Sequence, residues 1–261
     1  MLRCLITAIF YVVCTVPAEA QEAQGEPPLR TTFSGAASLT HNGISLVPSF
    51  SLGDPALLLD LKVTRGRWSF EPDLRVALEG KPWSMLFWLR YKTVRGKRFS
   101  LRTGAHPALN FRTIAVSRNG GTDEVLQARR YLAAELVPNY RLTDRLSVGA
   151  YYLHGRGFDE GSKTVNFLVL NANVGNIPLG DALNVRFSPQ VYYLRQDALR
   201  GYYAVGYLTL ELARLPFSVT GIVNEAFTTE ILPEQSSLWT VLFNYRFGAD
   251  APPLLGKRLQ P

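Results

Sequence analysis

The chain has 261 residues, enough for one large all-β domain or two small ones, and a formal net charge of +7. Its basic residues do not gather into one stripe, so the charge does not predict a nucleic-acid partner. Both cysteines, Cys4 and Cys14, lie in an N-terminal segment that we expect to be removed. This excludes disulfides, cysteine metal ligands and cysteine nucleophiles from the mature protein.

Residues 1–20 have the pattern of a secretory signal peptide. Arg3 supplies a short positive start, residues 4–16 form an apolar run, and Ala18-Glu19-Ala20 is a cleavage site, with cleavage expected before Gln21. The apolar run is shorter than the roughly 20 residues that a membrane-spanning helix needs, which disfavours an anchor. A lipoprotein acylated at Cys14 is disfavoured by the bulky Val13 before it. Residues 21–30 are polar and proline-bearing, and we interpret them as a flexible leader.

Regular turn residues divide the rest of the chain into segments of about nine to twelve residues, the length of a tilted transmembrane β-strand. Residues 31–40, before the hairpin signal Asn42-Gly43, are left open. They could be a further strand of a fourteen-stranded barrel, a periplasmic hairpin arm or an inward-folded segment. The twelve predicted strands are 44–52, 56–64, 68–79, 83–93, 98–107, 129–140, 145–155, 164–174, 183–194, 202–212, 217–228 and 237–247.

Apolar and more polar residues alternate along these strands. In the strand 183–194, Leu183, Val185 and Phe187 share one face. The clearest strands carry no charge on the apolar face, as expected where each Lys or Arg at mid-bilayer costs about 2–4 kcal/mol. Aromatic residues gather toward strand ends, where interfacial girdles lie. Those residues are Trp68, Trp83, Tyr91, Tyr140, Tyr151, Tyr152, Tyr193, Tyr202 and Tyr245. The pattern favours a lipid-embedded barrel over a soluble β-sandwich.

The last strand, 237–247 (SLWTVLFNYRF), alternates in the same way and ends in Phe247. It resembles the C-terminal assembly signal of Gram-negative outer-membrane β-barrel proteins, with Trp239, Phe243, Tyr245 and Phe247 as its aromatic positions. The resemblance implies a single porin-like antiparallel barrel over residues 31–247, in the outer membrane. It also implies outer-membrane lipid and the barrel assembly machinery as partners. Family members usually stop at that Phe, whereas this chain continues through residues 248–261, which we expect to form a periplasmic tail.

With both termini in the periplasm, the turns near Arg65, Arg95, Arg141, Asn176 and Arg214 are expected there. The remaining turns then face outward, and 108–128 is expected to be the longest outer loop, as is general for such barrels.

Charged residues on the inward faces suggest two interpretations. One is a mildly basic pore lining for small anionic or zwitterionic solutes. The other is an ion-pair network that fills a narrow barrel, because twelve strands lie between filled eight-stranded and open sixteen-stranded barrels. The predicted pore-lining residues are Asp60, Lys62, Glu71, Asp73, Arg75, Arg90, Lys92, Arg102, Glu135, Arg186, Glu211 and Arg246.

Lipid-modifying barrel enzymes pair a His with a Ser, and none of His41, His106 and His154 shows that spacing. Each histidine is predicted to be an interfacial or loop residue. No metal-ligand spacing appears, and no cofactor is predicted. We therefore predict a passive small-solute channel or structural barrel without catalysis. The alternatives are a lipid-modifying enzyme and a surface binding or adhesion barrel acting through residues 108–128.

Overall fold

The computed structural model describes residues 30–118, 121–232, 236–249 and 251. The predicted signal peptide and almost all of the predicted leader and tail lie outside this described part. The barrel consists of β1 (Thr31–Thr40), β2 (Ala56–Arg65), β3 (Trp68–Ala77), β4 (Pro82–Arg95), β5 (Phe99–Arg118), β6 (Gly121–Arg141), β7 (Leu146–Gly157), β8 (Thr164–Leu179), β9 (Leu183–Gln196), β10 (Leu199–Leu212), β11 (Phe217–Thr229) and β12 (Ser237–Gly248).

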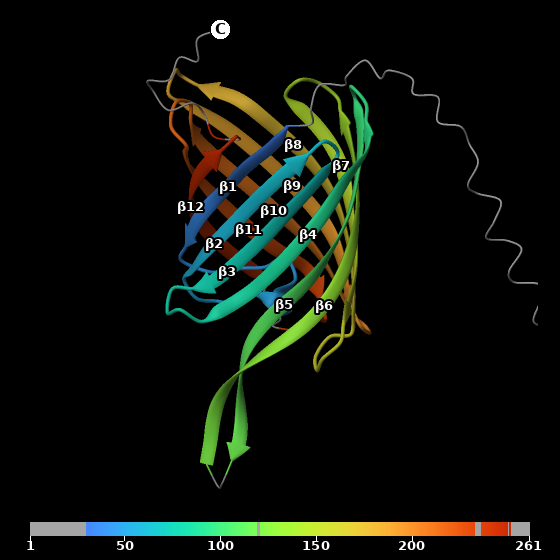
Figure 1. The fold of residues 1–261 in the computed structure, drawn as a ribbon, viewed down its shortest axis with the longest axis vertical. Coiled ribbons are helices and arrows are strands. Elements are labelled where there is room, and N and C mark those ends of the chain that lie inside the picture. The colour runs from blue at the N-terminus through green and yellow to red at the C-terminus, as the bar shows by residue number, and fades with distance from the viewer. Residues whose placement is uncertain (1–29, 119–120, 233–235, 250, 252–261) are drawn as a thin grey trace, which may run out of the picture. The chain divides into compact units, whose positions relative to one another are not determined.

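These strands form one closed antiparallel barrel (Figure 1). Each strand pairs with the next along the chain, and β1 closes the barrel against β12, with Gly35 opposite Phe247. The predicted single antiparallel barrel of about twelve strands is confirmed. We call the end where β1 begins and β12 finishes the terminus end, and the opposite end, where β5 and β6 join, the hairpin end.

The outer face of the barrel is apolar. On β12, Trp239 and Phe243 expose 58% and 51% of their surface, and Phe33 and Leu39 of β1 are similarly exposed. Their neighbours Ser38 and Thr40 point inward and are buried. Contact of an apolar face of this extent with lipid is favourable, whereas its exposure to water would cost free energy. Among the described residues, no helix is long and apolar enough to cross a membrane.

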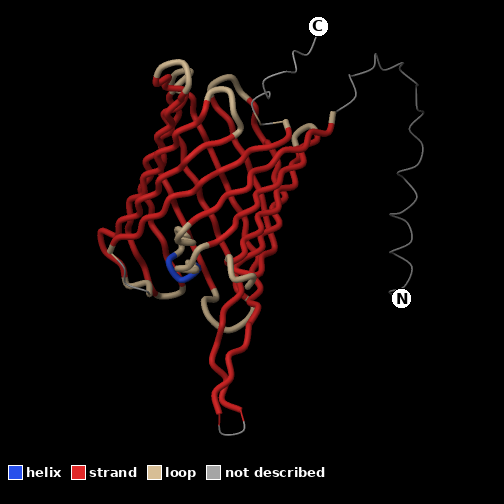
Figure 2. The backbone as a smooth tube through the Cα atoms, turned by 90° about the vertical axis from the view of Figure 1, so that its left-hand side faces the viewer, coloured by secondary structure: helices blue, strands red, loops and turns tan. Residues whose placement is uncertain are grey.

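The strand predicted at 44–52 is wrong, and residues 31–40 form β1 instead. Residues 41–55, which we call the luminal segment, connect β1 to β2 and contain one short 3-10 turn, η1 (Pro48–Phe50), drawn in blue in Figure 2. Leu46 and Val47 of this segment pack against buried side chains inside the barrel. The apolar residues of the segment therefore pack inside the lumen and do not form part of the barrel wall.

The long outer loop predicted at 108–128 is also wrong. β5 and β6 stay paired as far as Arg118 opposite Gly121, and this ribbon projects well beyond the barrel wall (Figures 1 and 2). β4 pairs with β5 only up to Asn110, and β7 pairs with β6 only from Tyr131. Residues 111–118 and 121–130 therefore lie outside the closed wall, where no continuous apolar column is needed to mark a strand.

A β-bulge changes the direction of one tryptophan. The pairing of β3 with β4 shifts register after Arg75, so that Arg75 lies opposite Ser84 and Val76 opposite Pro82. Trp83 is the extra residue, and its side chain is buried instead of joining the predicted girdle. Bulges are known to re-aim side chains in this way.

Candidate functional site: a cavity in the barrel lumen

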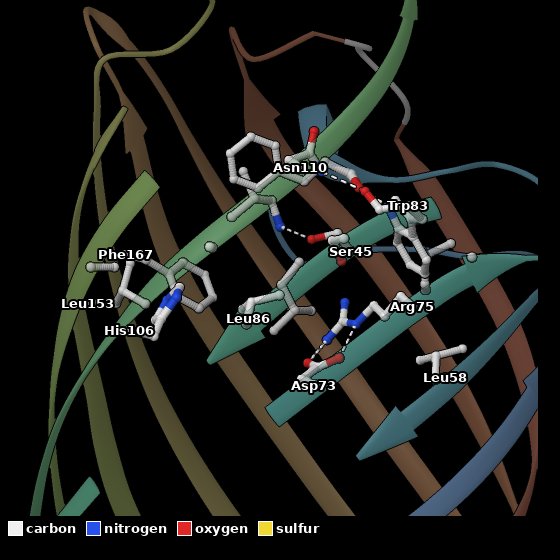
Figure 3. Close-up of a pocket in the computed structure, with 18 of the residues that line it drawn as sticks. Ser45, Leu58, Asp73, Arg75, Trp83, Leu86, His106, Asn110, Leu153 and Phe167 are labelled. Carbon is white, nitrogen blue, oxygen red and sulfur yellow. Dashed lines mark hydrogen bonds and ion pairs between the residues drawn. The ribbon is translucent and has the colours of Figure 1, made fainter. Parts of the chain in front are cut away.

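The lumen contains a cavity of about 490 Å³ beneath the luminal segment. Its walls are mostly apolar and aromatic, and its polar groups lie in a few places, which is the usual composition of a small-molecule site. Figure 3 shows part of this lining. The aromatic and histidine side chains around it are Phe50, Trp83, Trp88, His106, Tyr131, Tyr151, Phe167 and Tyr207.

The luminal segment closes the cavity through a small number of contacts with the wall. The Trp83 indole Nε1 donates a hydrogen bond of 2.7 Å to the Phe50 carbonyl oxygen. The Phe50 ring packs edge-on against Tyr131, with 5.2 Å between centroids. On the opposite wall, Ser49 exchanges hydrogen bonds of 3.0 and 2.8 Å with the Gln196 amide. The segment is therefore attached by individual side chains, not by a backbone ladder.

An apolar cluster fills the lumen beside this segment. Phe167 of β8, Tyr192 of β9 and Tyr203 of β10 pack in sequence, and the two tyrosine rings stack with 4.7 Å between centroids. Ile231, from the connection after β11, is buried in the same cluster. The hairpin end of the lumen is thus narrowed by two connections that turn inward.

Ion pairs form part of the cavity floor. The Arg90 guanidinium donates a hydrogen bond to the Glu71 carboxylate and forms an ion pair of 2.8 Å with Glu135. Glu135 also forms an ion pair of 3.1 Å with Arg102. Gly104 sits on the strand between Arg90 and Glu135, and a Cβ there would lie 2.9 Å from the Arg90 Cγ. The missing side chain at Gly104 is what allows this pair to form across β5.

A second pair joins Arg75 to Asp73 through two hydrogen bonds of 2.8 and 2.5 Å (Figure 3). The Arg75 guanidinium also lies 5.2 Å from the Trp83 ring centroid. Nearer the terminus end, the Glu211 carboxylate forms ion pairs with Arg186, at 3.2 Å, and with Arg246, at 3.7 Å. The luminal charges are therefore largely neutralised by one another.

The twelve residues predicted to line a pore all lie on the inward-facing column of their strands, and nine of them take part in these ion pairs. For Asp60, Lys62 and Lys92 no ion pair is found within the described residues. Whether these side chains border a conducting path stays a prediction. Sequence reasoning missed the aromatic wall, because Trp83 is re-aimed by the bulge and Trp88 was not singled out.

The three histidines occupy three different environments. His106 contradicts the prediction of a loop or interfacial residue, because it lies in β5, buried in the cavity wall, with its ring 4.0 Å from that of Trp88. His41 follows β1 and packs on Trp239 at 4.7 Å. His154 lies on the outer face and its Nδ1 is 3.0 Å from Asn166 Oδ1. Within the described residues, no group of three or more His, Asp or Glu could hold a metal ion.

No family model matches the chain, and no curated protein matches it. Solved outer-membrane barrels are similar in fold. An outer-membrane channel from Pseudomonas putida F1 is 8% identical, covering 87% of this chain and 98% of that one, with a TM-score of 0.49. OmpT, an outer membrane protein of Vibrio cholerae, is 8% identical over 87% and 99% of the two chains, with a TM-score of 0.40. LpxR from Salmonella typhimurium is 11% identical over 82% and 99%, with a TM-score of 0.46.

One expectation from the sequence is corrected by these similarities. We predicted a barrel without catalysis, and this prediction is wrong as an exclusion, because outer-membrane barrels of this fold include enzymes. The similarities, at these identities, concern the fold. With its closed strand order and apolar outer belt, the chain is a twelve-stranded β-barrel similar to outer-membrane proteins of Gram-negative bacteria.

Proposed function

We propose that this barrel is a restricted conduit for small solutes across the outer membrane and that the luminal segment is its gate. One observation carries the proposal: the luminal segment folds into the lumen above a cavity of about 490 Å³ instead of joining the wall. Its side-chain attachments can break without disturbing the strand ladder. Movement of the segment would connect the cavity with the hairpin end.

The lining favours compact, largely apolar solutes over ions. The charged groups of the floor already bond to one another, as Arg75 does to Asp73 and Arg90 to Glu71 and Glu135. Aromatic faces such as that of Trp88 supply apolar contact area. Phenol, which combines a ring with one polar group, is a suitable probe. We expect it to lower the conductance of the open barrel.

A reversible lock tests the gate directly. Because the predicted mature chain has no cysteine, the double variant S49C/Q196C introduces the only thiol pair. The Ser49 hydroxyl now lies 3.0 Å from the far end of the Gln196 side chain, so a short reducible bis-thiol cross-linker is needed to replace the length that the cysteine at 196 lacks. We expect the cross-linked double variant to give silent planar bilayers and the reduced protein, with the cross-link cleaved, to give stable current steps. The single variant S49C is the control and should conduct under both conditions.

Two results would contradict the gate. A cross-link that forms in full but leaves the current unchanged would show that the luminal segment does not close the path. Silence of the reduced double variant, of S49C and of the native barrel alike would remove the conduit itself.

We also propose that the chain reaches the outer membrane after cleavage before Gln21. The apolar run of residues 4–16 and the Ala18-Glu19-Ala20 site support this. N-terminal sequencing of the barrel purified from membranes tests it, and a sequence beginning upstream of Gln21 would contradict it.

A further inference from the structure

Four arginines lie near the hairpin end: Arg130 of β6 and Arg156 of β7 on one side of β8, and Arg195 of β9 and Arg200 of β10 on its other side. We call them the arginine row. We infer that the arginine row binds phosphate groups of membrane lipids in the leaflet at this end of the barrel. This inference does not depend on the conduit function.

The strand register places two members of the row side by side, and the other two lie across β8 from them. Arg195 and Arg200 are directly opposite each other on β9 and β10. Arg156 is opposite Leu132, two residues from Arg130, and its other neighbour is Thr164 of β8. Their inward neighbours Leu194 and Tyr203 are buried, which fixes the outward direction of the alternate side chains.

Like charges directly opposite each other on neighbouring strands destabilise a sheet. The described carboxylates relieve this only in part. Asp159 pairs with Arg130 at 2.7 Å, whereas Glu230 lies 3.9 Å from Arg200. Arg195 donates to the Asp197 backbone carbonyl, and neither Arg195 nor Arg156 has a carboxylate partner among the described residues. An anion between Arg195 and Arg200 would turn their repulsion into attraction.

The level of the row along the barrel axis identifies the anion as part of a lipid. Immediately below Arg195 and Arg200, the exposed face continues with Tyr193 and Tyr202, whose rings lie 5.1 Å apart. Below these tyrosines the face becomes aliphatic, with Val191 about half exposed. Tyrosines mark the interface between acyl chains and head groups, so the arginines lie at head-group height. Guanidinium groups bind phosphate oxygens in a bidentate manner, which lysines do not.

The experiment compares lipid retention by three forms of the full barrel purified from membranes. Native mass spectrometry counts phosphatidic acid and phosphatidylcholine molecules bound after both are added in equal amounts. The test variant is R156Q/R195Q/R200Q. The matched control is R95Q/K97Q/R98Q, which removes the same charge at the terminus end. Circular dichroism verifies that each variant is folded.

We expect the test variant to retain phosphatidic acid about tenfold less than the native barrel, since three charged contacts are lost. The control should retain it at the native level, and phosphatidylcholine should bind weakly to all three. Equal losses in test and control variants would overturn the inference in favour of general charge attraction. Displacement of the lipid by an equal concentration of inorganic phosphate would overturn it in favour of a site for the free ion.

Discussion

The Glu135 carboxylate is the residue on which the luminal charge network depends most. Its side chain has no exposed surface and faces both Arg90 and Arg102. Replacing it in the variant E135A would leave two arginines without their shared counter-ion. We expect a loss of about 3 kcal/mol in the free energy of unfolding, the lower end of the range for breaking a buried pair. Urea unfolding of the barrel in lipid vesicles measures this.

A matched control is the exposed pair between Glu79 and Lys81 in the connection after β3, at 3.1 Å. Because exposed pairs contribute little, E79Q should change stability by about 0.5 kcal/mol or less. If E135A were as harmless as E79Q, the luminal network would be solvated surface charge and not a structural element.

Asp159 gives a prediction for pH. Hydrogen bonds from Arg130 lower the pKa of Asp159 from 3.8 to about 2. A lowered pKa in the folded state means that the contact stabilises the connection between β7 and β8 above pH 4 and that this stabilisation is lost as the pH falls toward 2. In R130Q we expect the pKa of Asp159, measured by NMR at its carboxyl carbon, to rise part of the way toward its ordinary value, because the backbone N–H of residue 130 still donates to the carboxylate. An unchanged titration in R130Q would show that the Arg130 guanidinium is not the cause.

At the scale of elements, the attachment of the luminal segment can be weakened at a single bond. W83F keeps an aromatic ring but loses the hydrogen bond from Nε1 to the Phe50 carbonyl. A neutral hydrogen bond contributes about 1 kcal/mol, which corresponds to roughly fivefold faster opening of the segment. Hydrogen exchange of the backbone amides of residues 43–52 reports it. W68F, on the outer face at the terminus end, should leave this exchange unchanged, and equal effects would contradict the role of Trp83.

The elements also show how far the sequence could be interpreted. Most strand positions followed from alternation, because one face of the wall meets lipid, but β5 and β6 extend well beyond the predicted bounds 98–107 and 129–140. The choice between residues 31–40 and 44–52 did not follow from alternation, because Ile44, Leu46 and Val47 are partly buried inside the lumen and do not join the wall. A signal was present in β8, where Phe167, Leu168, Val169 and Leu170 are apolar in succession. Such a run indicates a strand covered on both faces.

The candidate site was predictable only in part for a related reason. Alternate residues of a strand point to opposite faces, so the inward-facing charged residues could be assigned from the sequence. Arg75, Arg90 and Glu135 do face inward. The cavity wall depends on two features that parity does not encode, the bulge at Trp83 and the packing of Phe50 on Tyr131. The bulge is a register shift between two paired strands, and the contact of Phe50 with Tyr131 joins segments distant in the chain.

At the scale of the whole molecule, closure of the barrel depends on the seam between β1 and β12. Gly35 of β1 lies opposite Phe247, and a Cβ at Gly35 would lie 2.6 Å from the Phe247 ring and 2.8 Å from the Asp60 carbonyl oxygen. G35V would therefore displace the last aromatic of β12 and press on the backbone of β2. Overpacking of this kind costs about 1–3 kcal/mol. We expect a lower yield of folded barrel in vesicles and a lower urea midpoint.

The matched control for the seam is Gly221 of β11, where a Cβ would meet no atom within 4 Å. G221V adds the same side chain within the same sheet and should fold with native yield. The pair of variants separates closure from β-propensity, because valine favours strands at both positions. If G35V folded as well as G221V, the ring of Phe247 would be free to move aside and barrel closure would not require a glycine at this point of the seam.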